Sequence, residues 1–97
     1  MGVISKTLGR MTGVTTLFEG TITRTAHVMT SVSEVIFFGV RFSEREEWIR
    51  VATADMTLAE RIAFLQSGDR VRIKVQGKIV QGRSRSQYHQ LVSVEMI

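Results

Sequence analysis

Five stretches of the chain have the alternation of apolar and polar residues, or the β-rich composition, that is typical of strands. In the first stretch one parity is mainly apolar, and its members are Phe18, Gly20, Ile22, Ala26 and Val28. The other four stretches cover residues 35–43, 48–54, 70–79 and 88–97. The sequence therefore predicts five short strands.

The spacing changes from that of a strand to that of a helix between the third and fourth stretches. Leu58, Ile62 and Leu65 follow one another at i, i+4 and i+7, which places them on one helical face. Thr57, with an acid three residues later, has the form of a capping box. Gly68 is suited to end the helix in a left-handed conformation. We expect one helix of about ten residues.

The predicted order of elements is β-β-β-α-β-β, which makes the protein mainly β. Five strands with a helix between the third and fourth are the plan of the OB fold, a partly open Greek-key barrel. We assign this OB-fold domain to residues 17–97 and interpret residues 1–16 as a flexible N-terminal arm or an extra strand. A small α+β sheet with the helix on one face is the alternative fold.

The composition restricts the class of protein. The chain has 97 residues, enough for one domain, and no cysteine, which excludes disulfides and thiolate chemistry. No apolar run approaches the roughly 20 residues that cross a bilayer, so we expect a cytoplasmic protein without a membrane partner. Residues 61–97 carry seven Lys or Arg against two acids. Such a basic third fits an acidic partner or a solvated surface.

Catalytic motifs are not found in the sequence. His27 and His89 are 62 positions apart and have no carboxylates at metal-ligand spacing. Glu46 and Glu47 are neighbours, and neighbouring residues of a strand point to opposite faces. Without a glycine-rich phosphate loop or a nucleophile motif, we expect no enzyme, no cofactor and no metal.

Outward positions on the second and third strands are candidate nucleic-acid contacts. On the third strand the apolar parity faces the core, which turns Trp48 and Arg50 outward. On the second strand a core parity that starts at Phe38 leaves Phe37 and Arg41 on the same open face. Trp48 could instead cover a barrel end or a subunit interface. Phe37 could instead pack in the core, because four apolar residues in a row leave its parity ambiguous.

Further along the chain, cations alternate with aliphatic residues, and the cationic parity could follow a phosphate backbone. These candidates, with one more possible stacking aromatic, are Arg72, Lys74, Lys78, Arg83, Arg85 and Tyr88. The alternative is that the cations only keep a strand face soluble. Tyr88 could likewise simply open the last strand.

Several short stretches resemble bacterial single-stranded-DNA-binding proteins and the related primosomal replication proteins. The Glu-Glu-Trp-Ile-Arg-Val run at residues 46–51 resembles an acid-Trp-x-Arg-Val segment of that family. The further matches are residues 18–24, 58–60 and 65–71, Gly77 and Tyr88. The resemblance spans roughly residues 17 to 97 and implies an OB fold that binds single strands, with Trp48 as the base-stacking position.

The sequence therefore predicts a protein that binds single-stranded DNA, or RNA, by base stacking and phosphate contacts. Because no acidic tip follows the last strand, we expect an accessory role in replication, recombination, or plasmid or phage DNA metabolism. Strand edges on a small barrel favour a homo-oligomer, a dimer or a tetramer. The alternative function is an OB-like assembly module, for instance in a phage particle, that binds no nucleic acid.

Overall fold

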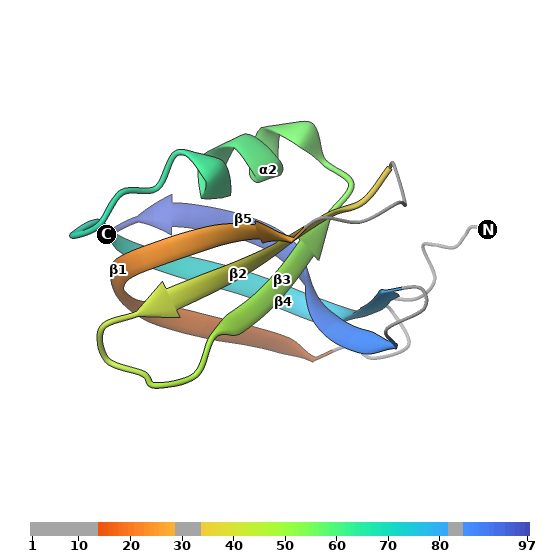
Figure 1. The fold of residues 1–97 in the computed structure, drawn as a ribbon, viewed down its shortest axis with the longest axis horizontal. Coiled ribbons are helices and arrows are strands. Elements are labelled where there is room, and N and C mark those ends of the chain that lie inside the picture. Colours follow the sequence, from red (N-terminus) through yellow and green to blue (C-terminus); the bar gives the residue numbers. More distant parts are fainter. Residues whose placement is uncertain (1–13, 29–33, 82–84) are drawn as a thin grey trace.

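The computed structural model describes residues 14–28, 34–81 and 85–97 (Figure 1). Most of the predicted N-terminal arm and the candidate Arg83 lie outside the described residues. The elements follow the predicted order: β1 (Thr15–Val28), β2 (Ile36–Phe42), β3 (Ile49–Thr53), α2 (Met56–Ala63), β4 (Arg70–Gln81) and β5 (Ser86–Met96).

The five strands form a closed barrel in the order β1-β2-β3-β5-β4. Every pairing is antiparallel except that of β3 with β5, which is parallel. In Figure 1, α2 lies over one side of the barrel, above β5. Ile62 of α2 is fully buried in the barrel core, with Leu58 and Leu65 packed against it. The predicted mainly β, five-stranded barrel with one short helix is confirmed, and the α+β alternative is wrong.

Strand β1 pairs with two neighbours, β4 and β2, because its 14 residues are enough for both pairings. Its first half pairs with β4, and its second half pairs with β2. A bulge between Ile22 and Arg24 shifts the register there, and an extra residue reverses which side faces inward. Beyond it Ala26 pairs with Gly39 on the outer side. The single apolar parity predicted through Val28 is therefore wrong after Ile22.

The apolar side chains form two clusters rather than one. The larger cluster fills the barrel and contains Phe38, Val40 and Phe42 of β2, as predicted. The second cluster consists of Phe37, Ala52 and Tyr88, with Val28, Val35 and Ile79 packed against it. Its members on β2 and β3 alternate with barrel residues, so this cluster lies on the outer side of the strands.

The hairpin of β4 and β5 covers the second cluster. The register of this pair shifts between Val75 and Lys78, around Gly77, whose φ is 77°. Beyond the shift Ile79 pairs with Tyr88, and both pack on the outer cluster. The prediction that Ile79 shares the inner parity of strand β4 is therefore wrong, because the bulge reverses that parity.

The helix begins at Met56, and its N-cap lies two residues before the predicted cap, Thr57. Asp55 is the N-cap, and its Oδ1 accepts hydrogen bonds from the backbone N–H of Thr57 at 2.8 Å and of Leu58 at 3.3 Å. The helix ends at Ala63, so Gly68 does not cap it. Gly68 instead has a φ of 100° in the turn to β4, where its N–H donates to the carbonyl of Ile22 at 2.8 Å. The predictions of a capping box at Thr57 and of a C-cap at Gly68 are both wrong.

Candidate nucleic-acid interface

Trp48 is the most exposed aromatic side chain on the β2–β3 face. It precedes β3, and because the next residue, Ile49, is buried in the barrel, Trp48 faces outward with 38% of its surface exposed. The inner edge of its ring lies against Gly39 of β2. A Cβ atom placed on Gly39 would lie 2.9 Å from Cε3 of Trp48, closer than any real carbon contact. This edge of the ring therefore lies against bare backbone, while the side chain as a whole remains partly exposed.

A groove of about 240 Å³ lies beside this ring. We call it the β2–β3 groove, and its lining residues are Ala26, Val28, Gly39, Trp48, Arg50 and Tyr88. Small side chains form its floor, because Ala26 and Gly39 are paired across β1 and β2. The guanidinium of Arg50 lies 6.0 Å from the centre of the Tyr88 ring. An aromatic wall, a flat floor and a cation form the combination that stacks a base and holds its phosphate.

Sequence reasoning did not identify the floor of this groove. The predicted parity places Ala26 on the core side, and Gly39 has no side chain from which a contact could be predicted. Only the register of β1 against β2, which depends on the bulge after Ile22, puts these two residues beside Trp48.

Phe37 and Tyr88 do not form an exposed stacking surface. Phe37 has the predicted outward parity but is only 2% exposed, and Tyr88 is 5% exposed. Their rings meet edge to face with centroids 4.8 Å apart. The prediction of Phe37 on an open face is wrong, because the β4–β5 hairpin covers it. Tyr88 still lines the groove, where Arg50 lies over its ring.

Arg41 continues the outer face of β2 beyond Gly39. It is half-buried, and its partner across the sheet is Arg24 of β1. Two arginines therefore lie next to each other on this face, one of which, Arg24, was not a candidate in the sequence. Within the described residues, neither arginine forms an ion pair that would hold its guanidinium away from the groove.

The cations of β4 do not form one continuous track. Arg72 is held by two carboxylates, Glu19 of β1 with Nε–Oε2 at 2.5 Å and Glu95 of β5 with Nη1–Oε1 at 3.4 Å. The hydrogen bond that Arg72 donates to Glu19 is the main reason why the pKa of Arg72 is raised. The charge of Arg72 is thus already matched, which makes it a poor phosphate contact.

The remaining candidates lie apart from Trp48 to different degrees. Lys74 is exposed on β4, and β5 separates that strand from β3. Lys78 and Arg85 are exposed near the tip of the β4–β5 hairpin, where Lys78 pairs with His89. The structure therefore brings together Trp48, Arg50 and the edge of Tyr88, and none of the β4 cations lines the β2–β3 groove.

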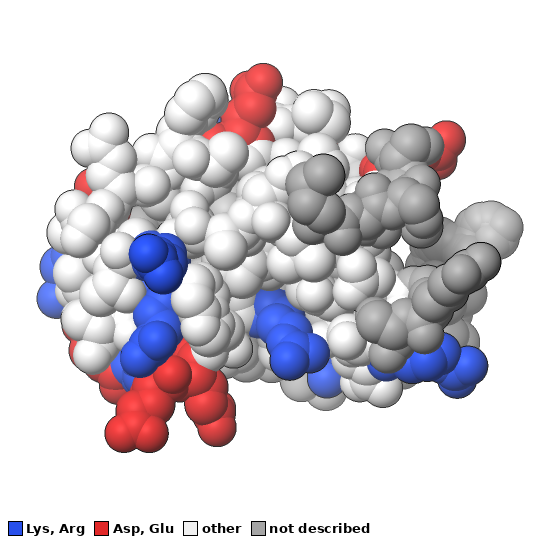
Figure 2. All heavy atoms as spheres, in the orientation of Figure 1, with Lys and Arg blue, Asp and Glu red and all other residues white. Residues whose placement is uncertain are grey.

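Figure 2 shows how charge is spread on one face of the molecule. Acidic side chains gather at the lower left, where Figure 1 places the β2–β3 turn, and Lys and Arg lie at separate points. One acid of that turn is structural: Glu44 accepts from the backbone N–H of Thr21 at 2.8 Å and from its hydroxyl at 3.0 Å. The backbone hydrogen bond from Thr21 lowers the pKa of Glu44.

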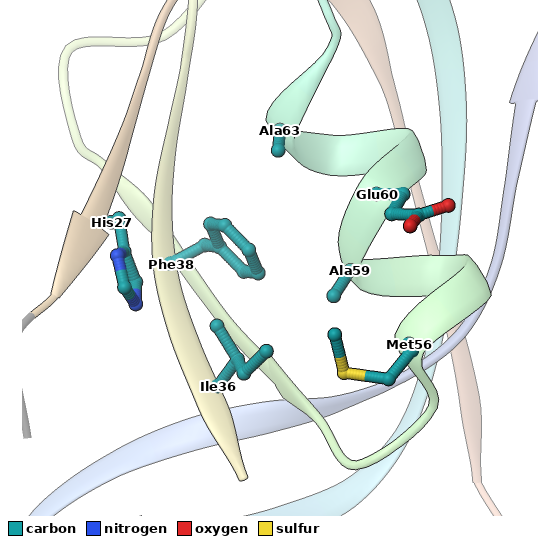
Figure 3. A pocket seen from close by; sticks show the side chains of 7 residues that line it. All are labelled: His27, Ile36, Phe38, Met56, Ala59, Glu60 and Ala63. Carbon is teal, nitrogen blue, oxygen red and sulfur yellow. The ribbon is translucent and has the colours of Figure 1, made fainter.

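An apolar hollow lies between β2 and α2, outside this face (Figure 3). In the close-up, Ile36, Phe38, Met56 and Ala59 point toward one another across it, and the carboxylate of Glu60 points away. Its volume is about 240 Å³. Because most of its lining residues are apolar and Glu60 points away, this hollow has few of the convergent polar groups of a ligand site.

Metal-binding clusters and membrane-spanning helices are absent from the described residues. Within residues 14–28, 34–81 and 85–97, no group of three or more His, Asp or Glu side chains is placed to hold a metal ion. In the same part of the chain, α2 is too short and too polar to cross a bilayer.

Comparison with known proteins places the fold. No protein-family model matches the chain, and no curated protein matches it in sequence. Solved structures of Rim1, a mitochondrial single-stranded DNA binding protein of S. cerevisiae, do match. Its form 1 crystal has a TM-score of 0.58 at 8% identity and covers 87% of this chain and 95% of Rim1.

The chain shares the OB-like fold of these Rim1 structures. Two further Rim1 structures agree: the selenomethionine-labelled form 2 has a TM-score of 0.55 at 7% identity, covering 86% of this chain and 92% of that one. The other form 2 structure has a TM-score of 0.54 at 8% identity, covering 87% and 94%. At such identities the likeness is one of fold, so the site has to be argued from its own residues.

Proposed function

We propose that the protein binds single-stranded DNA along the outer face of β1, β2 and β3. A base stacks on Trp48 in the β2–β3 groove, while Arg50 and Arg41 hold the backbone on either side. The observation that carries the proposal is the Trp48 ring itself, which rests on Gly39 and is 38% exposed beside a cation-lined groove. The single-stranded-DNA binding of the Rim1 proteins, which share the fold, supports it.

The geometry favours single strands over duplex. Base–aromatic stacking contributes about 1–3 kcal/mol per base, and it requires a base whose face is free. In a duplex each base is already stacked between its neighbours. Arginines that hold phosphates position the strand without reading its sequence, so the binding is expected to be independent of sequence.

The proposed cellular role follows the resemblance to bacterial single-stranded-DNA-binding and primosomal proteins. We place the protein as a non-enzymatic accessory factor of replication, recombination, or plasmid or phage DNA metabolism, acting in the cytoplasm. We also propose that it works as a homo-oligomer. Sedimentation of the full chain with and without a dT30 oligonucleotide tests the oligomeric state.

A titration with dT30 tests the proposed function. Trp48 is the only tryptophan of the chain, so quenching of its fluorescence reports on this one site. We expect quenching by dT30 in low salt and none by a matched duplex. With a labelled oligonucleotide, Trp48→Ala should bind about 5- to 150-fold more weakly, the equivalent of one lost stacking contact.

Phe64→Ala is the matched control. Phe64 follows α2, is 76% exposed and lies outside the β2–β3 groove, so its removal should leave the affinity unchanged. Two results contradict the proposal: no binding of dT30 at tens of micromolar protein in low salt, or equal affinities of folded Trp48→Ala and parent. The first would favour the assembly module instead. Equal affinity for a matching RNA would widen the ligand to both nucleic acids.

A further inference from the structure

Trp48 separates the β2–β3 groove from a second cavity of about 200 Å³. We call this cavity the β3–β5 hollow, because it lies where β1, the β2–β3 turn, β3 and β5 meet. Its lining residues are Phe18, Arg45, Glu47, Trp48, Ile49, Arg50, Gln87 and His89. Trp48 and Arg50 line both cavities, so a strand stacked on Trp48 has only to pass its ring to enter the hollow.

Aromatic contacts hold two nitrogen-bearing side chains of the hollow in place. The guanidinium of Arg45 lies 5.3 Å from the centre of the Phe18 ring. The imidazole of His89 lies at the same distance, 5.3 Å between ring centroids, and is tilted by 55°. Arg45 comes from the β2–β3 turn and His89 from β5, so the tertiary fold brings them to a common partner on β1. This arrangement is prepared before any ligand binds.

The charges around the hollow favour an anion. Arg45 and Arg50 oppose one carboxylate, that of Glu47, which leaves a net charge of one positive unit when His89 is neutral. Protonated His89 would raise it to two. Lys78 of β4, the cross-strand partner of His89, adds a further positive charge nearby. Two further acids of the same turn, Glu44 and Glu46, do not line the hollow, and Glu44 accepts two hydrogen bonds from Thr21.

We propose that the β3–β5 hollow is a second nucleotide subsite, in which Arg45, Arg50 and His89 hold a phosphodiester group of the strand whose base stacks on Trp48. The inference rests on the proposed function and adds a path to it: the strand crosses from the groove, over Trp48, into the hollow. It also makes His89 a titrating contact of that strand.

The sign of the pH effect follows from the surroundings of His89. Partial burial, and then the charge of Lys78, lower the pKa of His89 below its ordinary value near 6.5, so the free protein carries a neutral imidazole at pH 7. A bound phosphodiester favours the protonated form and raises that pKa, so binding is coupled to proton uptake. Affinity should therefore rise as the pH falls from 8.0 toward 5.5.

The chain provides a matched control for this effect. It has two histidines, and the other one, His27, lies beside Phe38 with ring centroids 5.7 Å apart, at the β2–α2 hollow. We expect parent and His27→Gln to bind dT30 roughly two- to fivefold more tightly at pH 5.5 than at pH 8.0, the range of a partly exposed ion pair. His89→Gln should show no such gain between pH 8.0 and pH 5.5.

Two further measurements separate this role from a structural one. In NMR titrations, saturating dT30 should raise the pKa of His89. Arg45→Gln, a change in an exposed turn, should weaken binding at both pH values and reduce the log–log salt slope by about 0.7. It also tests the hollow if His89→Gln does not fold.

The outcomes distinguish the two proposals. A pH response that persists in folded His89→Gln, or parental affinity and salt slope in Arg45→Gln, would overturn the subsite while Trp48-dependent binding remained. Failure of the parent to bind dT30 at either pH would overturn both the subsite and the proposed function.

Discussion

At the scale of single residues, the site depends on the absence of a side chain. Gly39 is buried in β2 without a positive φ, so its backbone does not require glycine. What requires it is space, because the Trp48 ring occupies the volume that a Cβ atom would take. A glycine within a strand often marks such a close approach, here of an aromatic ring that remains 38% exposed.

Gly39→Ala should displace the Trp48 ring without unfolding the barrel. Trp48 is partly exposed and can move outward, and alanine restores about 0.5–1 kcal/mol that glycine loses within a strand. We expect a shifted tryptophan emission maximum and a dT30 affinity that falls toward that of Trp48→Ala. Fluorescence and the labelled-oligonucleotide titration measure the two effects.

Gly68→Ala is the control for that substitution. A Cβ atom there meets no other atom within 4 Å, but the φ of 100° is unfavourable for alanine. This variant should lose about 1–2 kcal/mol of stability and keep its affinity for dT30 when folded. An unchanged emission spectrum and affinity in Gly39→Ala would show that the ring does not need the glycine.

At the scale of elements, bulges decide which residues face the barrel. The irregularity after Ile22 turns Ala26 outward to form the groove floor. Those between Lys74 and Lys78 turn Ile79 onto the outer cluster. Each bulge bends its strand, so the same features that close the barrel also shape its outer surface.

The start of α2 offers a test at this scale. Asp55 accepts from two backbone N–H groups, whereas Thr57 contributes its own N–H and no cap. Asp55→Ala should therefore lower the free energy of unfolding by about 1 kcal/mol. Asp55→Asn should restore most of it, and Thr57→Ala should change little. Urea denaturation measures all three, and a larger loss in Thr57→Ala would favour the capping box.

At the scale of the whole molecule, the net charge of +4 does not show which cations are already paired with carboxylates. Arg72 bridges three strands through Glu19 and Glu95, whereas Arg50 lines both cavities beside Trp48. A phosphate gains little from a cation whose charge is already neutralised. The basic C-terminal third is thus a weaker guide to the binding surface than its composition suggests.

Salt dependence should separate these two arginines. Each phosphate neutralised on a single strand contributes about −0.7 to the slope of log affinity against log salt. Arg50→Gln should reduce that slope by about 0.7, and Arg72→Gln should leave it nearly unchanged. Titrations with dT30 at salt concentrations from about 50 to about 300 mM measure this slope. The reverse ranking would move the phosphate path to β4.

The sequence by itself determined the order of the elements, the presence of one helix and the outward position of Trp48. These properties depend on local periodicity, which records which side of a strand or helix faces the core. The tertiary structure decided which residues meet: the Gly39 support, the burial of Phe37, and the partners of Arg72, one of them 53 residues away. Register, bulges and the closing hairpin set those contacts, because pairing between strands is specified by the whole barrel and not by any one strand.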